Sequence, residues 1–184
     1  MNLQETWRSH SKVNNVTNRL TTVLFIIYVI ALCWILLFKL GVQFSYMENR
    51  SINLIPFREF FLYGKIDVVE IILNVLIFVP LGIYTGMLFD KWIFGKNLFF
   101  FFLFSLIVEG LQFILAIGAF DITDVITNTL GGIIGLIIFK GLDKAFNNGV
   151  RAQKFINIIA AIGTVFMILL LVLLKMNMLP VRYQ

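Results

Sequence analysis

Long apolar runs separated by short polar segments dominate this sequence. Residues 20–40 form a nearly unbroken apolar run, about as long as the ~20 residues that a helix needs to cross a bilayer. Similar runs follow at residues 67–89, 97–117, 122–142 and 154–174, the last starting at 154 or 155. The pattern predicts an all-α integral membrane protein, a bundle of about five transmembrane helices in one domain over residues 20–174.

Three segments fall outside these runs. Residues 1–19 are polar and show no cleavable signal peptide, which predicts a cytoplasmic tail. Residues 175–184 form a second short tail. The segment 41–66 is too polar to span and too aromatic for a plain loop, so it either re-enters the membrane between helices or lies on its surface as an amphipathic helix.

Composition strengthens the membrane interpretation and excludes several chemistries. Hydrophobic residues make up 60% of the chain, well above soluble domains. The net charge of +5 arises from scattered basic residues that form no stripe, so nucleic acid is not an expected partner. The only histidine, His10, and the only cysteine, Cys33, lie far apart. These positions disfavour a His-ligated zinc site and a Ser/His or Cys/His nucleophile, and we expect no cofactor.

The distribution of basic residues orients the predicted bundle. With a cytoplasmic N-terminus, the 15 basic residues divide nine inside to six outside. The turn at residues 118–120, which would then be outside, has no basic residue. Positive residues are enriched in cytoplasmic segments. We therefore expect a multi-pass protein of the cell membrane with the N-terminus in the cytoplasm and the C-terminus outside.

Polar residues recur within three consecutive predicted helices. Asp121, Asp124 and Asn128 share a helix face, and so do Ser105, Glu109 and Gln112. At about 1.5 Å per residue, the side chains within the spans lie about 5 to 12 Å below the outer surface. These depths predict one outward-facing polar cavity with six lining residues: Asn74, Glu109, Gln112, Asp121, Asp124 and Asn128.

Several roles for this cavity remain open. Arg58 could serve as the counter-ion of Glu109 if the segment around Asn53 folds over the cavity, so we include both residues among the candidate ligand contacts. Alternatively, a protonated Glu109 could hydrogen-bond Gln112 or Asn128 and hold helices together.

Chemistry at the same carboxylates is also open. As an enzyme, the protein could use Glu109 and Asp124 as general acid and base. Asp121 and Asp124 could hold a divalent cation, although nothing in the sequence resembles a glycine loop that cradles a phosphate.

Packing residues stand out in three helices. Gly131 and Gly135 form a GxxxG pair, and Gly82 and Gly86 repeat its spacing. Such pairs permit close helix approach, so we expect the two helices to pack together and to bring Asn74 beside Asn128. The phenylalanines at 99–102 and 104 are predicted to face lipid, and the helix at 154–174, whose polar residues are Asn157 and Thr164, to serve packing.

Four sequence blocks together resemble a known family. NLIPF, LNVLIFVPLG, SLIVEGLQ and FDITDVITNTLGGIIG occur in this order within residues 53–142. The series is similar to the VanZ family of bacterial membrane proteins, named for a teicoplanin-resistance protein. The resemblance implies a role at the bacterial cell envelope and in resistance to this lipid-anchored glycopeptide.

Together with the polar residues, the resemblance suggests that the cavity binds an envelope lipid or a lipoglycopeptide. The alternatives are an enzyme that modifies a lipid-linked cell-wall precursor, and a small-solute transporter or scaffold. The oligomeric state is not predicted.

Overall fold

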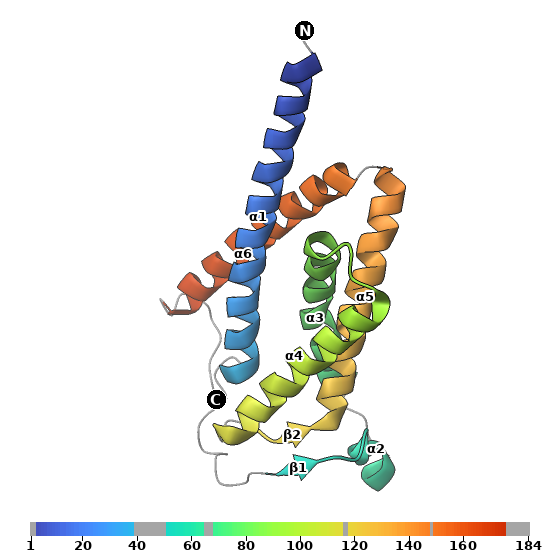
Figure 1. Ribbon diagram of the computed structural model, residues 1–184. Helices are drawn as coiled ribbons and strands as arrows, with labels where there is room; N and C mark the ends of the chain where they lie inside the picture. The colour runs from blue at the N-terminus through green and yellow to red at the C-terminus, as the bar shows by residue number, and fades with distance from the viewer. Residues whose placement is uncertain (1–2, 39–50, 65–67, 116–117, 148, 176–184) are drawn as a thin grey trace.

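The computed structural model describes residues 3–38, 51–64, 68–115, 118–147 and 149–175 (Figure 1). Helices dominate these residues, and two strands of two residues each pair at one end of the molecule. In chain order the elements are α1 (Leu3–Phe38), β1 (Ile52–Asn53), α2 (Arg58–Tyr63), α3 (Val68–Leu88), α4 (Phe94–Ile114), β2 (Phe120–Asp121), α5 (Ile122–Phe146) and α6 (Gly149–Lys175).

Four of the described helices are long and apolar enough to cross a membrane. These spans are Val16–Leu36 within α1, Val68–Leu88, Phe94–Ile114 and Ile122–Phe146. The buried share of these spans ranges from 22% to 44%. The apolar side chains on their outer faces therefore require an apolar environment. The all-α membrane fold predicted from the sequence is thereby confirmed. The fifth predicted span falls in α6, where the side chains of the last turns lie outside the described residues.

The first helix begins earlier than predicted. Residues 3–19, expected to form a tail separate from the first span, continue α1 without a break. A helix of 36 residues is about 54 Å long, which exceeds the ~30 Å hydrocarbon core. Its N-terminal turns accordingly project beyond the other helices in Figure 1.

Glycines let α3 and α5 lie side by side. A Cβ atom added to Gly131 would overlap the backbone carbonyl of Val75, and one added to Gly135 would overlap that of Val79. In the other direction, a Cβ at Gly82 would overlap the carbonyl of Gly132. The close approach predicted from the GxxxG spacing is therefore confirmed, and the two helices run in the same direction.

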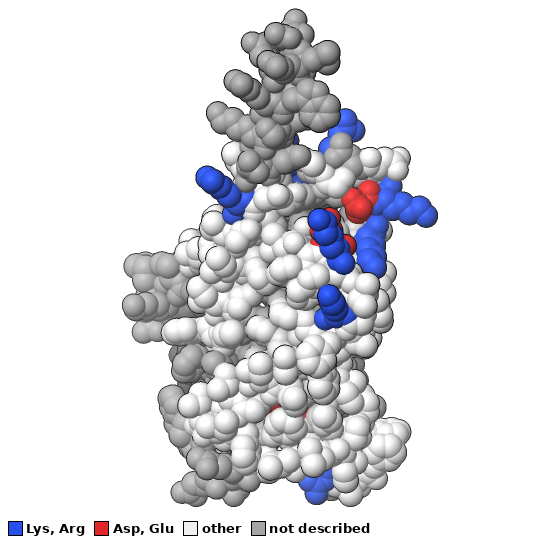
Figure 2. Space-filling model, in the orientation of Figure 1, with Lys and Arg blue, Asp and Glu red and all other residues white. Residues whose placement is uncertain are grey.

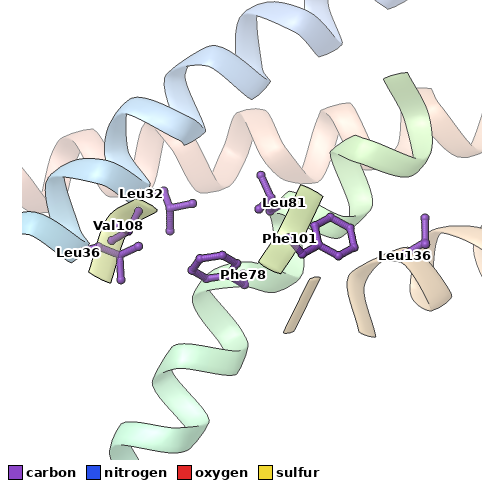
Figure 3. Close-up of a cluster of buried hydrophobic side chains, with 7 residues drawn as sticks. All are labelled: Leu32, Leu36, Phe78, Leu81, Phe101, Val108 and Leu136. Atoms are coloured by element: carbon purple, nitrogen blue, oxygen red, sulfur yellow. The ribbon is translucent and has the colours of Figure 1, made fainter. Parts of the chain in front are cut away.

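One phenylalanine of the predicted lipid-facing run is a core residue. Phe101 is fully buried, and its ring lies over Gly132, where a Cβ would come within 2.5 Å of it. Phe99 and Phe102 are exposed as predicted, whereas Phe100 and Phe104 are partly buried against the core cluster. The error arose because a run of identical apolar residues contains no periodicity from which the inward face can be assigned. The buried apolar cluster, drawn in Figure 3, consists of Leu32, Leu36, Phe78, Leu81, Phe101, Val108 and Leu136.

The last helix is attached to α1 by polar side chains. Asn157 on α6 donates to the hydroxyl of Thr21 at 2.9 Å, and Gln153 donates to the same oxygen at 2.8 Å. Asn157, Gln153 and Thr21 are all buried. The helix predicted to serve only packing therefore crosses α1 obliquely over a hydrogen-bonded contact (Figure 1).

A proline interrupts the middle of α3. Pro80 lacks the N–H that would bond the preceding turn, and the carbonyl of Ile77 nearby accepts a 2.6 Å hydrogen bond from the hydroxyl of Tyr28 on α1. This contact fixes α1 against α3 at the level of the core.

Candidate functional site

The carboxylate at the start of α5 accepts hydrogen bonds through both of its oxygens. Asp121 is the N-cap of α5, and its Oδ1 accepts from the backbone N–H of Thr123 at 2.7 Å. Its Oδ2 accepts from the side-chain amide of Asn53 at 2.9 Å. An aspartate at this position satisfies helix donors that have no partner within the helix. The predicted juxtaposition of Asn53 with the acidic stripe is thus present.

A short clasp holds the segment after residue 50 to the start of α5. We define the β1–β2 clasp as residues 51–57 together with residues 120–123. Its strands are parallel, with Asn53 opposite Asp121, and the N–H of Phe120 donates to the Ser51 carbonyl at 3.0 Å. The N–H of Phe57 donates to the Thr123 hydroxyl at 3.0 Å. Because a parallel pair joins distant segments, this clasp could not be predicted from local sequence.

The backbone at Phe57 turns sharply out of the clasp. Phe57 has φ 53° and ψ 37°, a left-handed conformation that is uncommon for a residue with a Cβ. The hydrogen bond to Thr123 holds this residue at the point where the clasp ends and α2 begins. The position of α2 therefore depends directly on the first turn of α5.

Glu109 is the most buried carboxylate in the cluster. It lies within the α4 span and is only 2% exposed. Its Oε2 accepts from the backbone N–H of Asp121 at 3.4 Å, at the positive end of α5. Arg58, predicted as its counter-ion, is instead exposed at the start of α2, and no ion pair between the two is among the described contacts. Among the described contacts of Glu109, the hydrogen bond from the N–H of Asp121 therefore places it against the start of α5.

The remaining polar residues form separate interhelical pairs. Asn74 on α3 donates to Asp124 Oδ1 at 2.7 Å, whereas the sequence predicted only that Asn74 would lie beside Asn128. Asn128 instead donates to the hydroxyl of Ser105 on α4 at 3.0 Å. Asn74 meets Asp124 because α3 and α5 run in parallel with their first turns at the same end of the bundle.

Gln112 is turned away from these pairs. Its side-chain amide donates to the carbonyl of Leu36 on α1 at 2.7 Å. Leu36 lies in the last turn of α1, where carbonyls have no intrahelical donor. Gln112 therefore joins α4 to the end of α1, one turn from Glu109.

Only one end of the buried Asn128 side-chain amide forms a hydrogen bond among the described residues. This side chain is fully buried, and its Oδ1 has no hydrogen-bond partner within the part of the chain that the structure describes. A buried acceptor of this kind normally finds a donor. Donors also serve the neighbouring carboxylates: an amide reaches Asp124 and another reaches Asp121. The cluster therefore consists largely of hydrogen-bond acceptors, and N–H groups of the protein donate to its carboxylates.

The structure bears on metal binding at Asp121 and Asp124 and on several contacts that were not predicted. In the described ranges, no three His, Cys, Asp or Glu side chains gather to hold a metal ion. The sequence reasoning did not find Thr123 as a clasp residue or the contact of Thr21 with Gln153 and Asn157. For the contact of Thr21 with Gln153 and Asn157, the available signal in the sequence was the presence of polar residues within an apolar span.

The fold and these contacts define a polytopic membrane protein with polar side chains paired between α3, α4 and α5 near one end of the bundle. Residues 25–146 match the VanZ/LLP1 family model. The chain is also 39% identical over 153 residues to Protein VanZ of Enterococcus faecium, an alignment that covers 81% of this chain and 89% of the relative. The protein therefore belongs to the VanZ/LLP1 family. No solved structure matches it significantly.

Proposed function

We propose that this protein binds an envelope lipid head group or a lipoglycopeptide at the acceptor-rich end of α5, and thereby contributes to teicoplanin resistance. The observation that carries the proposal is Glu109, a carboxylate 2% exposed inside a span and held against the first turn of α5. Carboxylates inside a membrane are costly, which makes a functional role the first hypothesis for them. Membership in the VanZ/LLP1 family supports a role at the envelope.

The charge distribution supports an outward-facing site. The described basic side chains gather at the end of the bundle where α5 leads into α6, whereas α2, which begins with Arg58, lies at the other end (Figures 1 and 2). The basic residues near the α5–α6 end include Lys91, Lys96, Lys140, Lys144, Arg151 and Lys154. The ends of membrane helices that carry an excess of Lys and Arg side chains are usually cytoplasmic. The Asp121 end would then face outward, where a lipoglycopeptide arrives.

The contacts also suggest which ligand groups suit the site. Glu109, Asp121 and Asp124 each accept hydrogen bonds from N–H groups of the protein. A ligand that replaces one of these donors must bring an amine, an amide or a hydroxyl. Head groups with amino or hydroxyl functions and the sugars of a lipoglycopeptide meet this requirement. An ionised phosphodiester, which only accepts hydrogen bonds, does not.

The test is teicoplanin susceptibility of a deletion strain that carries the wild-type gene or single variants. We expect Glu109→Gln and Asp124→Asn to lose most of the protection given by the wild type. The matched control is Asp143→Asn, which neutralises an exposed carboxylate near the other end of α5, and it should protect fully. Membrane levels of every variant are measured in parallel by immunoblot.

The result would contradict the proposal if Glu109→Gln and Asp124→Asn protected as well as Asp143→Asn at equal membrane levels. Binding is tested separately with purified protein in nanodiscs and fluorescent teicoplanin. We expect saturable binding by the wild type that weakens at least tenfold in Glu109→Gln. Equal binding by the two proteins would remove the assigned role of this carboxylate.

A further inference from the structure

An apolar surface is exposed where the clasp leads into α2. We define the interfacial segment as residues 54–63, which contain α2. Among its side chains, Phe61 is 73% exposed and Leu54 is 66% exposed. The other exposed large apolar side chains of the segment are Ile55, Phe57, Phe60 and Leu62. So many neighbouring apolar side chains require an apolar partner.

The clasp determines where this surface lies relative to the membrane. Asn53 is bonded to Asp121 and Phe57 is bonded to Thr123, both at the very start of the α5 span. In Figure 1, α2 lies beyond the lower ends of α3 and α5, outside the helix bundle. The segment is therefore at the level where two spans enter the bilayer. With six residues, α2 is far too short to cross it.

The neighbouring span continues the apolar surface. The first turns of α3 expose Val68, Val69 and Ile72, each at least 50%. Since α3 is a membrane span, these side chains face lipid acyl chains. The apolar surface of the interfacial segment thus adjoins, along the chain, a surface that already contacts lipid.

A single basic residue completes the pattern. Arg58 begins α2 and is exposed. A long basic side chain can reach the phosphate level of a bilayer while apolar neighbours remain in the acyl region. Aromatic residues favour the same boundary. The segment therefore combines the side chains typical of an element that lies in the membrane interface.

We propose that residues 54–63 lie in the boundary between head groups and acyl chains at this end of the bundle, with the phospholipid bilayer as their partner. Phe60, Phe61 and Leu62 insert among the upper acyl chains, and Arg58 contacts lipid phosphates. The β1–β2 clasp sets the depth of insertion. This inference stands on the exposed surface and the clasp, and it does not depend on the proposed function.

The test measures the depth of spin labels in vesicles of phosphatidylethanolamine and phosphatidylglycerol. Labels are placed at Phe61→Cys or Leu62→Cys in a Cys33→Ser background. The reference for the hydrocarbon core is Leu76→Cys, a lipid-exposed position further along α3, and the aqueous reference is Lys144→Cys on the basic end of α5. Accessibility to oxygen and to a water-soluble nickel complex gives the depth of each label.

We expect an oxygen-to-nickel accessibility ratio at positions 61 and 62 that is several-fold above that at position 144 and below that at position 76. A ratio equal to that of Lys144→Cys at both positions would overturn the proposal, because the surface would then face water. A ratio equal to that of Leu76→Cys would also overturn it, because the segment would then enter the membrane core.

A second variant tests the part played by the clasp. Asn53→Leu removes the 2.9 Å hydrogen bond to Asp121 while retaining a side chain of similar size. Combined with the label at position 61, it should change the accessibility ratio at least twofold and broaden the range of depths. An unchanged ratio and line shape would refute the role of the clasp in setting the depth.

Discussion

Replacing Gly135 by alanine tests the packing that brings the polar residues together. The added Cβ would overlap the carbonyl oxygen of Val79 and lie 2.9 Å from the Val79 carbonyl carbon and 3.0 Å from the N of Ile83. These are backbone atoms of α3, so no side chain can rotate away and the helices must separate. Overpacking costs about 1–3 kcal/mol, and the upper end applies where backbone has to move.

A control on the same helix isolates this effect. Gly141 also lies in α5, but a Cβ there would meet nothing within 4 Å. Gly141→Ala should therefore retain or improve stability, because alanine favours a helix over glycine by up to ~1 kcal/mol. For Gly135→Ala that gain only partly offsets the overlap. We expect a net loss of about 2 kcal/mol, roughly thirtyfold in the unfolding equilibrium.

The assay is unfolding by sodium dodecyl sulfate from mixed micelles, followed by circular dichroism. Gly135→Ala should unfold at a lower detergent fraction than the wild type, and Gly141→Ala should not. If the two alanine variants unfolded at the same fraction, the described contact between α3 and α5 would not hold the helices together. Gly135→Ala should also protect less well against teicoplanin than Gly141→Ala, since Asp124 reaches Asn74 across the contact between α3 and α5.

Three further substitutions, one of them paired with a control, test other contacts by the same unfolding assay. Asn157→Leu should lower the free energy of unfolding by about 1–2 kcal/mol, because it removes hydrogen bonds to α1. The control Thr164→Val loses only a hydrogen bond within α6 and should change the free energy of unfolding by less than ~0.5 kcal/mol. Equal effects of the two substitutions would contradict the role of Asn157. Phe101→Ala should cost about 3–5 kcal/mol through the cavity it leaves, and a loss below ~1 kcal/mol would show that this ring is not in the core. Asn74→Leu should cost about 1–3 kcal/mol by removing the donor to Asp124, and an unchanged midpoint would exclude that bond.

The helix content and several helix boundaries could be predicted from the sequence. An apolar run of about 20 residues crosses a bilayer as a helix, because a helix satisfies its own backbone hydrogen bonds there. For this reason α3 and α5 begin within one residue of their predicted starts, at Val68 and Ile122. The start of α1 was misplaced, because a polar sequence can continue a helix beyond the membrane and hydropathy does not report this.

The candidate site could be predicted in part. Burial of Glu109, Gln112 and Asn128 is confirmed, since polar side chains in a span avoid lipid. Their partners were predicted less well: Gln112 bonds α1, and Asn128 bonds Ser105. Helical spacing defines which residues share a face, but it does not define which neighbouring helix that face meets.

By itself, the sequence of this protein determined the membrane fold, the apolar spans, the buried polar positions and the glycines at which helices approach. Each of these follows from local periodicity and from the cost of exposing polar groups to lipid. Only the tertiary structure decided that Asn53 meets Asp121, that Glu109 lies against the start of α5, and that α6 is bonded to α1. The physical reason is that such hydrogen bonds depend on directions and distances between distant segments, which chain order leaves open until the helices have packed.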